Sequence, residues 1–323
     1  LSRGTEESAK VNKFFTLIKL AITVFVIVVG FTYMNTDNFS PFIPPAQPPV
    51  VAHGVSGDVW GQPMLAWLFG AQPSQYGWLG VISGAALVFF AFLGFDIVAT
   101  SAEEVKDPQK TLPRGILGGL AVVTVLYILV TLALTGMVPY TELAKAENPS
   151  LATAFIAVGA GWAAQVIPVG VLAGMTTVVM VLLMSTSRVL LALCRDGLLP
   201  RSWGVTSKRK TPVRLQVAVG IIVALLAGFT NVEALEEMIN IGTLSAFVLV
   251  SVGVLVLRKK NPQGSGYRVP FGPVLPVLSA VLCVYLMMNL ATLTWARFLA
   301  WMVLGTVIYV CYGMRQSRLA KGD

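Results

Sequence analysis

Charged residues are scarce in this sequence, at 12% of its 323 positions, and the mean hydropathy is +0.77. Because soluble domains carry about 25% charged residues, a water-soluble fold is excluded. Hydrophobic residues make up 56% of the chain. At roughly 20 apolar residues per crossing, this composition leaves room for about eight membrane-spanning helices joined by loops.

Histidine and cysteine are also scarce, and their positions exclude several kinds of site. His53 is the one histidine, and Cys194, Cys283 and Cys311 are far apart with no metal-ligand spacing. No nucleophile motif, paired acids within an apolar run or glycine-rich phosphate loop is present. We therefore expect no disulfide framework, metal or cofactor, and an intramembrane enzyme is disfavoured.

What the sequence has in abundance is apolar runs of about 20 residues, each long enough for one membrane crossing. Eight such runs are present, which predicts an all-α polytopic membrane protein. They lie near residues 14–33, 78–101, 115–137, 162–193, 213–229, 238–257, 274–290 and 295–312.

The net charge of +8 does not indicate a nucleic-acid-binding face, since the basic residues lie between apolar runs. If the first run enters from the cytoplasm, only Lys145 and Arg297 of the 23 lysines and arginines fall outside. Lys19 falls within the membrane. The positive-inside rule then places both ends of the chain in the cytoplasm.

Residues 34–76 contain no lysine or arginine and many prolines. This composition predicts a long external loop without a folded core. Small residues at helical spacing, such as Gly170 with Gly174, are typical of close packing between membrane helices.

The second run contains a glycine and a carboxylate in its middle, in the stretch Phe89 to Asp96. An unbroken lipid-facing helix disfavours both residue types. A helix break is therefore plausible, and the carbonyls that it frees are tolerated at membrane depth only where they line a cavity and bind a ligand such as an ammonium group. The structural alternative is a packed glycine with Asp96 capping the next half-helix.

Lys19 lies roughly 9 Å deeper along a helix axis than Lys13. It is either a lysine that snorkels to the interface or a proton-titratable group that faces the interior of the bundle. Glu103 and Glu104, with the basic residues that follow, are typical of a solvated rim at a span end, and a gate is the less favoured interpretation.

Several motifs, taken together and in this order, resemble the amino acid/polyamine/organocation transporters, in particular the bacterial cationic amino acid transporter branch. The resemblance covers nearly the whole chain and is weakest in residues 46–74. The motifs are Glu7-Ser8-Ala9-Lys10-Val11-Asn12, Phe89 to Asp96 with Ala102-Glu103-Glu104, Arg195-Asp196-Gly197-Leu198-Leu199-Pro200, Ile241-Gly242-Thr243-Leu244 and Tyr267-Arg268-Val269-Pro270.

The resemblance implies a fold of two inverted five-helix repeats, usually followed by two further helices. Residues 1–323 would form an amino acid permease transmembrane domain from the fifth helix onward: the last helix of the first repeat, the whole second repeat and two additional helices. The second run would be the broken helix. Four preceding helices are expected as partners, so the chain reads as a fragment.

The resemblance also implies roles for individual residues. The carbonyls of Phe90, Ala91 and Leu93 around Gly94 would hold the amino group of the substrate, with the Phe90 ring as a gate. These groups form half of a site, because in relatives the first helix binds the carboxylate. Lys19 would couple transport to protons and would reach hydroxyls such as Ser185 or Thr186, and Asp96 would support the break or a gate.

The sequence thus predicts a proton-coupled amino acid transporter of the bacterial inner membrane, whose partners are the substrate, protons and lipid. Two other interpretations stay open. A truncated scaffold would insert and move nothing, and an organic-cation channel would equilibrate its solute without alternating access. The identity of the amino acid, the stoichiometry and the oligomeric state do not follow from the sequence.

Overall fold

The computed structural model describes residues 5–47, 59–70, 76–100, 105, 107–143, 145, 149–206, 212–260 and 269–316. Within these ranges the regular secondary structure is helical, joined by turns and irregular segments, apart from one isolated β-bridge between Pro63 and Ala291. The α-helices are α1 (Thr5–Thr32), α2 (Met64–Phe69), α3 (Gly77–Val88), α4 (Phe95–Thr100), α5 (Pro108–Met137), α6 (Tyr140–Leu143), α7 (Leu151–Ala157), α8 (Gly161–Ala164), α9 (Ile167–Arg195), α10 (Val213–Phe229), α11 (Val232–Lys260), α12 (Val274–Met288), α13 (Thr292–Ile308) and α14 (Met314–Gln316).

Each of the expected apolar runs contains helix, and in the described residues five helical segments are long and apolar enough to cross a membrane. Three shorter apolar helices accompany them, at Gly77–Ala86, Val213–Phe229 and Val274–Met288. The prediction of an all-helical protein with several membrane-spanning segments is confirmed. The five long segments are Val11–Thr32, Pro108–Met137, Gly161–Arg195, Ala234–Lys260 and Thr292–Gly313.

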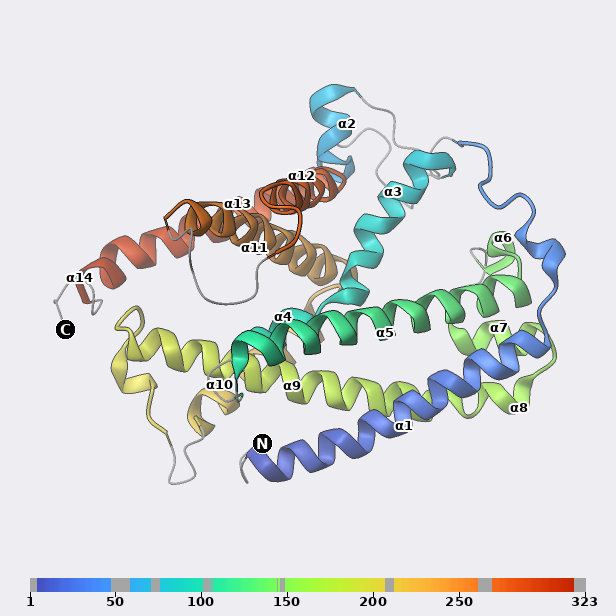
Figure 1. The fold of residues 1–323 in the computed structure, drawn as a ribbon, viewed down its shortest axis with the longest axis horizontal. Coiled ribbons are helices and arrows are strands. Elements are labelled where there is room, and N and C mark those ends of the chain that lie inside the picture. The colour runs from blue at the N-terminus through green and yellow to red at the C-terminus, as the bar shows by residue number, and fades with distance from the viewer. Residues whose placement is uncertain are drawn as a thin grey trace. The chain divides into compact units, whose positions relative to one another are not determined.

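The chain folds into two compact units, each made of two stretches of sequence. The first unit comprises Leu1–Phe42 and Gly115–Ile221. In it, α1 lies along α9, as Figure 1 shows, and the short helices α7 and α8 pack against the beginning of α9. Its core consists mainly of small and aliphatic side chains, with Phe155 the largest fully buried one.

Close backbone approach in the first unit depends on glycine. A Cβ added at Gly170 would lie 2.7 Å from the Cγ2 of Ile22, and one at Gly30 would lie 2.9 Å from the Cβ of Ala133. The first position fits the packing expected of small residues there. The end of α5 is tied to the segment after α1, because the carbonyl of Gly136 accepts hydrogen bonds from the amide nitrogen of Asn35 at 2.9 Å and the Nδ2 of Asn38 at 2.7 Å.

The second unit comprises Ile43–Arg114 and Ile222–Asp323. Here α11 packs against both α12 and α13, and the three helices lie side by side in Figure 1. The helix α3 packs against α11 and α12. The core of this unit is an apolar cluster in which Ile241 and Leu244 of α11 are fully buried beside Met287 and Leu290.

Part of the segment 34–76 is folded, so the expectation of a loop without a folded core is wrong for residues 59–70. The amide of Met64 donates to the carbonyl of Leu290 at 3.0 Å, and the amide of Thr292 donates to the carbonyl of Gln62 at 2.9 Å. These bonds flank the β-bridge, and α2 packs against α13. Backbone pairing needs no apolar pattern, which is why composition does not reveal it.

Large apolar side chains stay exposed along every long helix. Val122 of α5 is 58% exposed, Leu172 of α9 is 67% exposed and Leu249 of α11 is 68% exposed. Contiguous apolar surface of this extent is untenable in water. Lipid, or further apolar helices, must therefore cover these faces, as in a multi-pass membrane protein.

Candidate functional site

The second apolar run is interrupted at the residues where the sequence predicts a break. The helix α3 ends at Val88, a 3-10 turn, η3, covers Phe89–Phe92, and α4 begins at Phe95. Between them Leu93 is extended, with φ −61° and ψ 141°, and Gly94 has φ +119°. Because only glycine takes that φ readily, Gly94 is the residue that permits the two half-helices to be joined in this way.

The interruption replaces the regular helical hydrogen bonds with short local ones. The amide of Leu93 donates to the carbonyl of Phe90 at 3.1 Å, and the amide of Ile97 donates to the carbonyl of Gly94 at 3.2 Å. A carbonyl oxygen has two lone pairs, so one such hydrogen bond does not exhaust the acceptor capacity of the Phe90 carbonyl. This segment presents the kind of backbone acceptor set that an ammonium group recognises.

Phe247 of α11 holds both sides of the interruption. The ring of Phe89 meets it edge-on with 5.9 Å between ring centroids, and the ring of Phe95 stacks on it at 5.3 Å with 30° between the planes. Such aromatic pairs contribute about 0.5–1.5 kcal/mol each beyond area burial. The break is therefore fixed against α11 by its flanking rings, and Gly94 is left between them.

The remaining predicted residues of this segment differ in exposure. The side chain of Phe90 is 41% exposed, which leaves the ring available to cover a ligand. Ala91 is exposed, and Leu93 is half-buried. Asp96 is the second residue of α4 and not its N-cap, so the capping alternative does not describe its backbone position; its side chain lies outside the described residues.

Lys19 belongs to the first unit, where it is half-buried on α1. Its backbone carbonyl accepts a hydrogen bond from the Oγ1 of Thr23 at 2.8 Å. Ile22 lies one helical turn beyond it and contacts Gly170 of α9. Since residues three apart share a helix face, Lys19 lies on the face of α1 that is turned toward α9.

The hydroxyls predicted to receive Lys19 lie elsewhere along α9. Ser185 is buried and Thr186 is exposed, but Ser185 follows Gly170 by fifteen residues, or about 22 Å of helix. Lys19 precedes Ile22 by about 4.5 Å of helix, and α1 and α9 run in opposite directions (Figure 1). Lys19 therefore does not reach Ser185 or Thr186 in this arrangement, because the register between the two helices places these hydroxyls well beyond the length of a lysine side chain.

One feature of the site lies outside the sequence-based prediction. Phe247 is one apolar residue among many in its run, and no pattern distinguishes it. Lys110 and Arg114 of α5 are both exposed, as expected of a rim, whereas Glu103 and Glu104 lie outside the described residues. No group of three or more potential metal ligands is found in the described part of the chain.

Comparison with known proteins relates the chain to a transporter family. A family profile described as amino acid permease matches residues 1–310. The match thus includes α1, the interrupted helix and the whole of α11 to α13.

Individual relatives cover the chain almost completely. The methylthioribose transporter of Bacillus subtilis (strain 168) is 42% identical over 323 residues, which are 99% of this chain and 63% of that protein. The branched-chain amino acid permease BcaP of the same organism is 38% identical over 98% of this chain and 62% of its own length. The vacuolar cationic amino acid transporter 4 of Arabidopsis thaliana is 35% identical over 81% of this chain. The chain thus spans less than two thirds of the length of these relatives.

Proposed function

Because the chain belongs to the amino acid permease family, we propose that it works as part of a proton-coupled secondary transporter of amino acids that operates by alternating access. The family makes it a membrane transporter and not an enzyme. The observation that carries the finer proposal is the interrupted helix, with Leu93 extended and Gly94 at φ +119°.

In this proposal the carbonyls of Phe90, Ala91 and Leu93 hold the ammonium group of the substrate. An ammonium group offers three N–H donors, and backbone carbonyl oxygens at a helix interruption within the membrane are natural acceptors for it. Phe90 covers the bound group with its exposed ring. The substrate carboxylate is bound by helices of the first repeat that the resemblance places before α1, in line with the longer relatives.

The proposed architecture has eight crossings, with both ends of the chain on the cytoplasmic side of a bacterial inner membrane. The apolar helices α3, α10 and α12 join the five long segments as the remaining crossings. The α1 helix then closes the first repeat, and α12 and α13 follow the second repeat. Asp96, as an acidic residue in the first turn of α4, is suitably placed to stabilise that helix start.

Lys19 is the proposed proton-coupling group. It is half-buried, and it lies within the apolar segment Val11–Thr32 on the face turned toward α9. A lysine at that position alternates between a charged form that holds neighbouring acceptors and a neutral form that releases them. Since Ser185 and Thr186 lie too far along α9, the proposal for coupling rests on Lys19 alone.

A solute without an ammonium group is the competing substrate class. The relative that is 42% identical to this chain over 323 residues is named a methylthioribose transporter, and that sugar derivative lacks an amino group. Carbonyl acceptors also bind sugar hydroxyls, although hydroxyls carry no charge to complement. The two substrate classes are therefore separable by experiment.

The test is uptake by the protein made from the entire reading frame that encodes this chain, reconstituted in liposomes. With an inwardly directed proton gradient, we expect an amino acid from a branched-chain and cationic panel to accumulate above its outside concentration. A protonophore should abolish accumulation and leave exchange of labelled for unlabelled substrate intact.

Three other results would contradict the proposal in different ways. Accumulation of methylthioribose with no amino acid would overturn the ammonium assignment. Equilibration without accumulation would indicate a channel. Neither uptake nor exchange of any solute in the panel would favour the scaffold interpretation.

A further inference from the structure

Asn240 of α11 is a fully buried polar residue that finds no partner among the described residues. Its side chain is 0% exposed, and both the Oδ1 and the Nδ2 atoms lack a hydrogen-bond partner in that part of the chain. Buried polar groups in proteins are almost always paired, and an exception indicates a bound ligand, water or ion. The neighbouring Ile241 and Leu244 are fully buried and apolar, so the amide is unpaired within a hydrophobic core.

A carboxyl group lies one helical turn away on the same face of α11. Glu237 precedes Asn240 by three residues, a spacing that brings the two Cβ atoms to about 5–6 Å. The Oε2 of Glu237 accepts a hydrogen bond from the Oγ1 of Thr294 in α13. Since Thr294 is 0% exposed, this bond turns the carboxyl toward the interior of the second unit.

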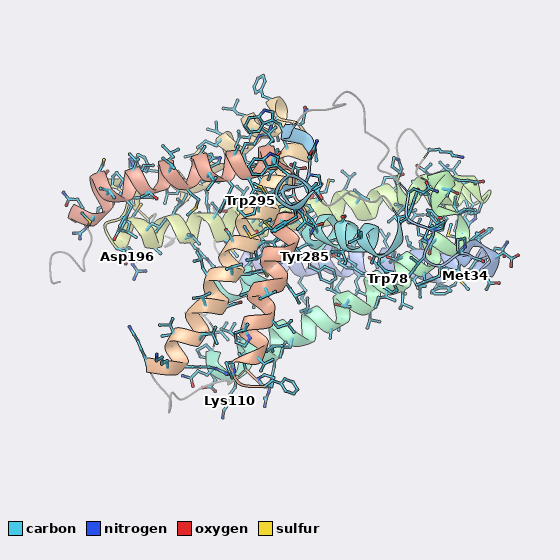
Figure 2. The ribbon with its side chains drawn as sticks, turned by 90° about the horizontal axis from the view of Figure 1, so that it is seen from above. Met34, Trp78, Lys110, Asp196, Tyr285 and Trp295 are labelled. Atoms are coloured by element: carbon cyan, nitrogen blue, oxygen red, sulfur yellow. The ribbon has the colours of Figure 1, made fainter. Side chains whose placement is uncertain are left out.

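The start of α13 that carries Thr294 is held firmly. Trp295, labelled in Figure 2, donates a hydrogen bond from its Nε1 to the carbonyl of Met287 at 3.0 Å, and its ring meets that of Phe298 edge-on. The amide of Thr292 is bound to Gln62. The hydroxyl of Thr294 is thus presented to Glu237 from a fixed position.

The elements packed against α11 offer little to neutralise a carboxylate at Glu237. Among the described residues, α2, α3 and η3 carry no charged or titratable side chain, α12 contributes Cys283 and Tyr285, and α13 contributes Arg297. No ion pair joins Arg297 to Glu237 within the described part of the chain. On α11 itself, Glu236 is a further acidic group and the side chain of Glu233 is not described.

We propose that Glu237, Asn240 and Thr294 form a proton-binding carboxyl–amide site between α11 and α13. A protonated carboxyl group has one O–H donor and one carbonyl acceptor, whereas a carboxylate has acceptors only. A primary amide is complementary to the protonated form, because its Nδ2–H donates to the carbonyl and its Oδ1 accepts from the O–H.

Binding of one proton therefore satisfies both atoms of Asn240 that now lack partners. A rotamer change brings the carboxyl group of Glu237 and the amide of Asn240 into direct contact, or one water molecule bridges them. The Thr294 hydroxyl retains its bond to the carboxyl in either form. This site goes beyond the proposed function, because it lies in the second unit and requires neither Lys19 nor a bound substrate.

The test is infrared difference spectroscopy of the purified protein from the entire reading frame, without substrate, as the pH is lowered. A protonated carboxyl gives a C=O stretching band that a carboxylate lacks. We expect a band that appears reversibly on acidification and is lost in Glu237→Gln. The matched control is Glu236→Gln, which removes the adjacent acid on another helix face and should retain the band.

Two further variants report on the partners without removing the acid. Asn240→Leu and Thr294→Val each remove a hydrogen bond to the carboxyl and should move the band to higher frequency, which keeps the proposal testable if Glu237→Gln fails to fold. A spectrum unchanged by Glu237→Gln would overturn the proposal, as would a band that sodium, and not acid, controls. Since no substrate is present, failure here leaves the amino acid uptake test unaffected.

Discussion

Replacement of Gly94 by alanine tests the central element of the proposed site, and the structure makes the expected effect specific. A Cβ at this position would meet no atom within 4 Å, so the substitution introduces no clash. It does place an alanine at φ +119°, a conformation that costs a residue with a Cβ on the order of 1–3 kcal/mol. The strain favours closure of the break into regular helix.

That free energy translates into a measurable loss of binding. At about 1.4 kcal/mol for each tenfold change, a penalty of about 1–3 kcal/mol lowers the equilibrium constant for interrupted over regular helix by roughly 5- to 150-fold. If only the interrupted form binds substrate, the apparent affinity falls by up to the same factor, in proportion to the fraction of interrupted helix that is lost. Equilibrium binding of the labelled substrate to the purified full-reading-frame protein measures it, with uptake as a second readout.

The same run contains a matched control in Gly84. It lies within α3, its backbone φ is not positive, and a Cβ added there would also meet nothing within 4 Å. Gly84→Ala should leave binding unchanged and stabilise the helix by about 0.5–1 kcal/mol. Equal affinities for Gly94→Ala and Gly84→Ala would refute the reasoning that the break is required for binding.

Three further predictions follow from other parts of the chain. In a background without the native cysteines, His53→Cys should react with an impermeant maleimide in intact cells and Lys208→Cys should not; the reverse pattern would contradict the orientation inferred from the basic residues. Lys19→Met should abolish accumulation driven by a proton gradient and leave substrate binding measurable, whereas a snorkelling lysine predicts nearly unchanged uptake. Phe247→Ala should lower stability by about 3 kcal/mol and weaken binding, because it removes both ring contacts at the break; thermal unfolding measures the first effect, and Phe247→Leu should lose less.

The helices of this protein are largely predictable because a helix that crosses a membrane needs a long apolar run, which the sequence shows directly. The runs expected at 213–229 and 274–290 correspond closely to α10 and α12, and the break between Phe89 and Asp96 occurs where glycine and a carboxylate interrupt an apolar run. Helix ends that extend beyond the apolar runs are harder to predict from the sequence. The helix α1 begins at Thr5, well before the apolar residues, since its first turns are polar and carry no hydropathy signal.

Contacts between distant segments are not predictable from these patterns. Ser185 and Thr186 have the right chemistry to partner a lysine, but only the register between α1 and α9 decides which residues meet Lys19. The sequence of the apolar run around Asn240 likewise does not reveal that its amide is unpaired. Phe247 acquires its role from the position of two other rings. In each case the missing information is a pairing between helices, which single-sequence periodicity does not contain.

The pairing of Gln62 and Met64 with the turn between α12 and α13 has a mechanical consequence for the interrupted helix. The first half-helix, α3, follows this bonded segment in the sequence. The Oγ of its Ser83 also donates a hydrogen bond to the Oδ1 of Asn289, at the same turn, with 3.4 Å between the two atoms. Both α3 and the segment that precedes it are thus bonded to the turn between α12 and α13. A bend at Gly94 would then act as a one-sided hinge, in which α3 stays fixed to α12 and any swing of α4 has to separate the stacked rings of Phe95 and Phe247.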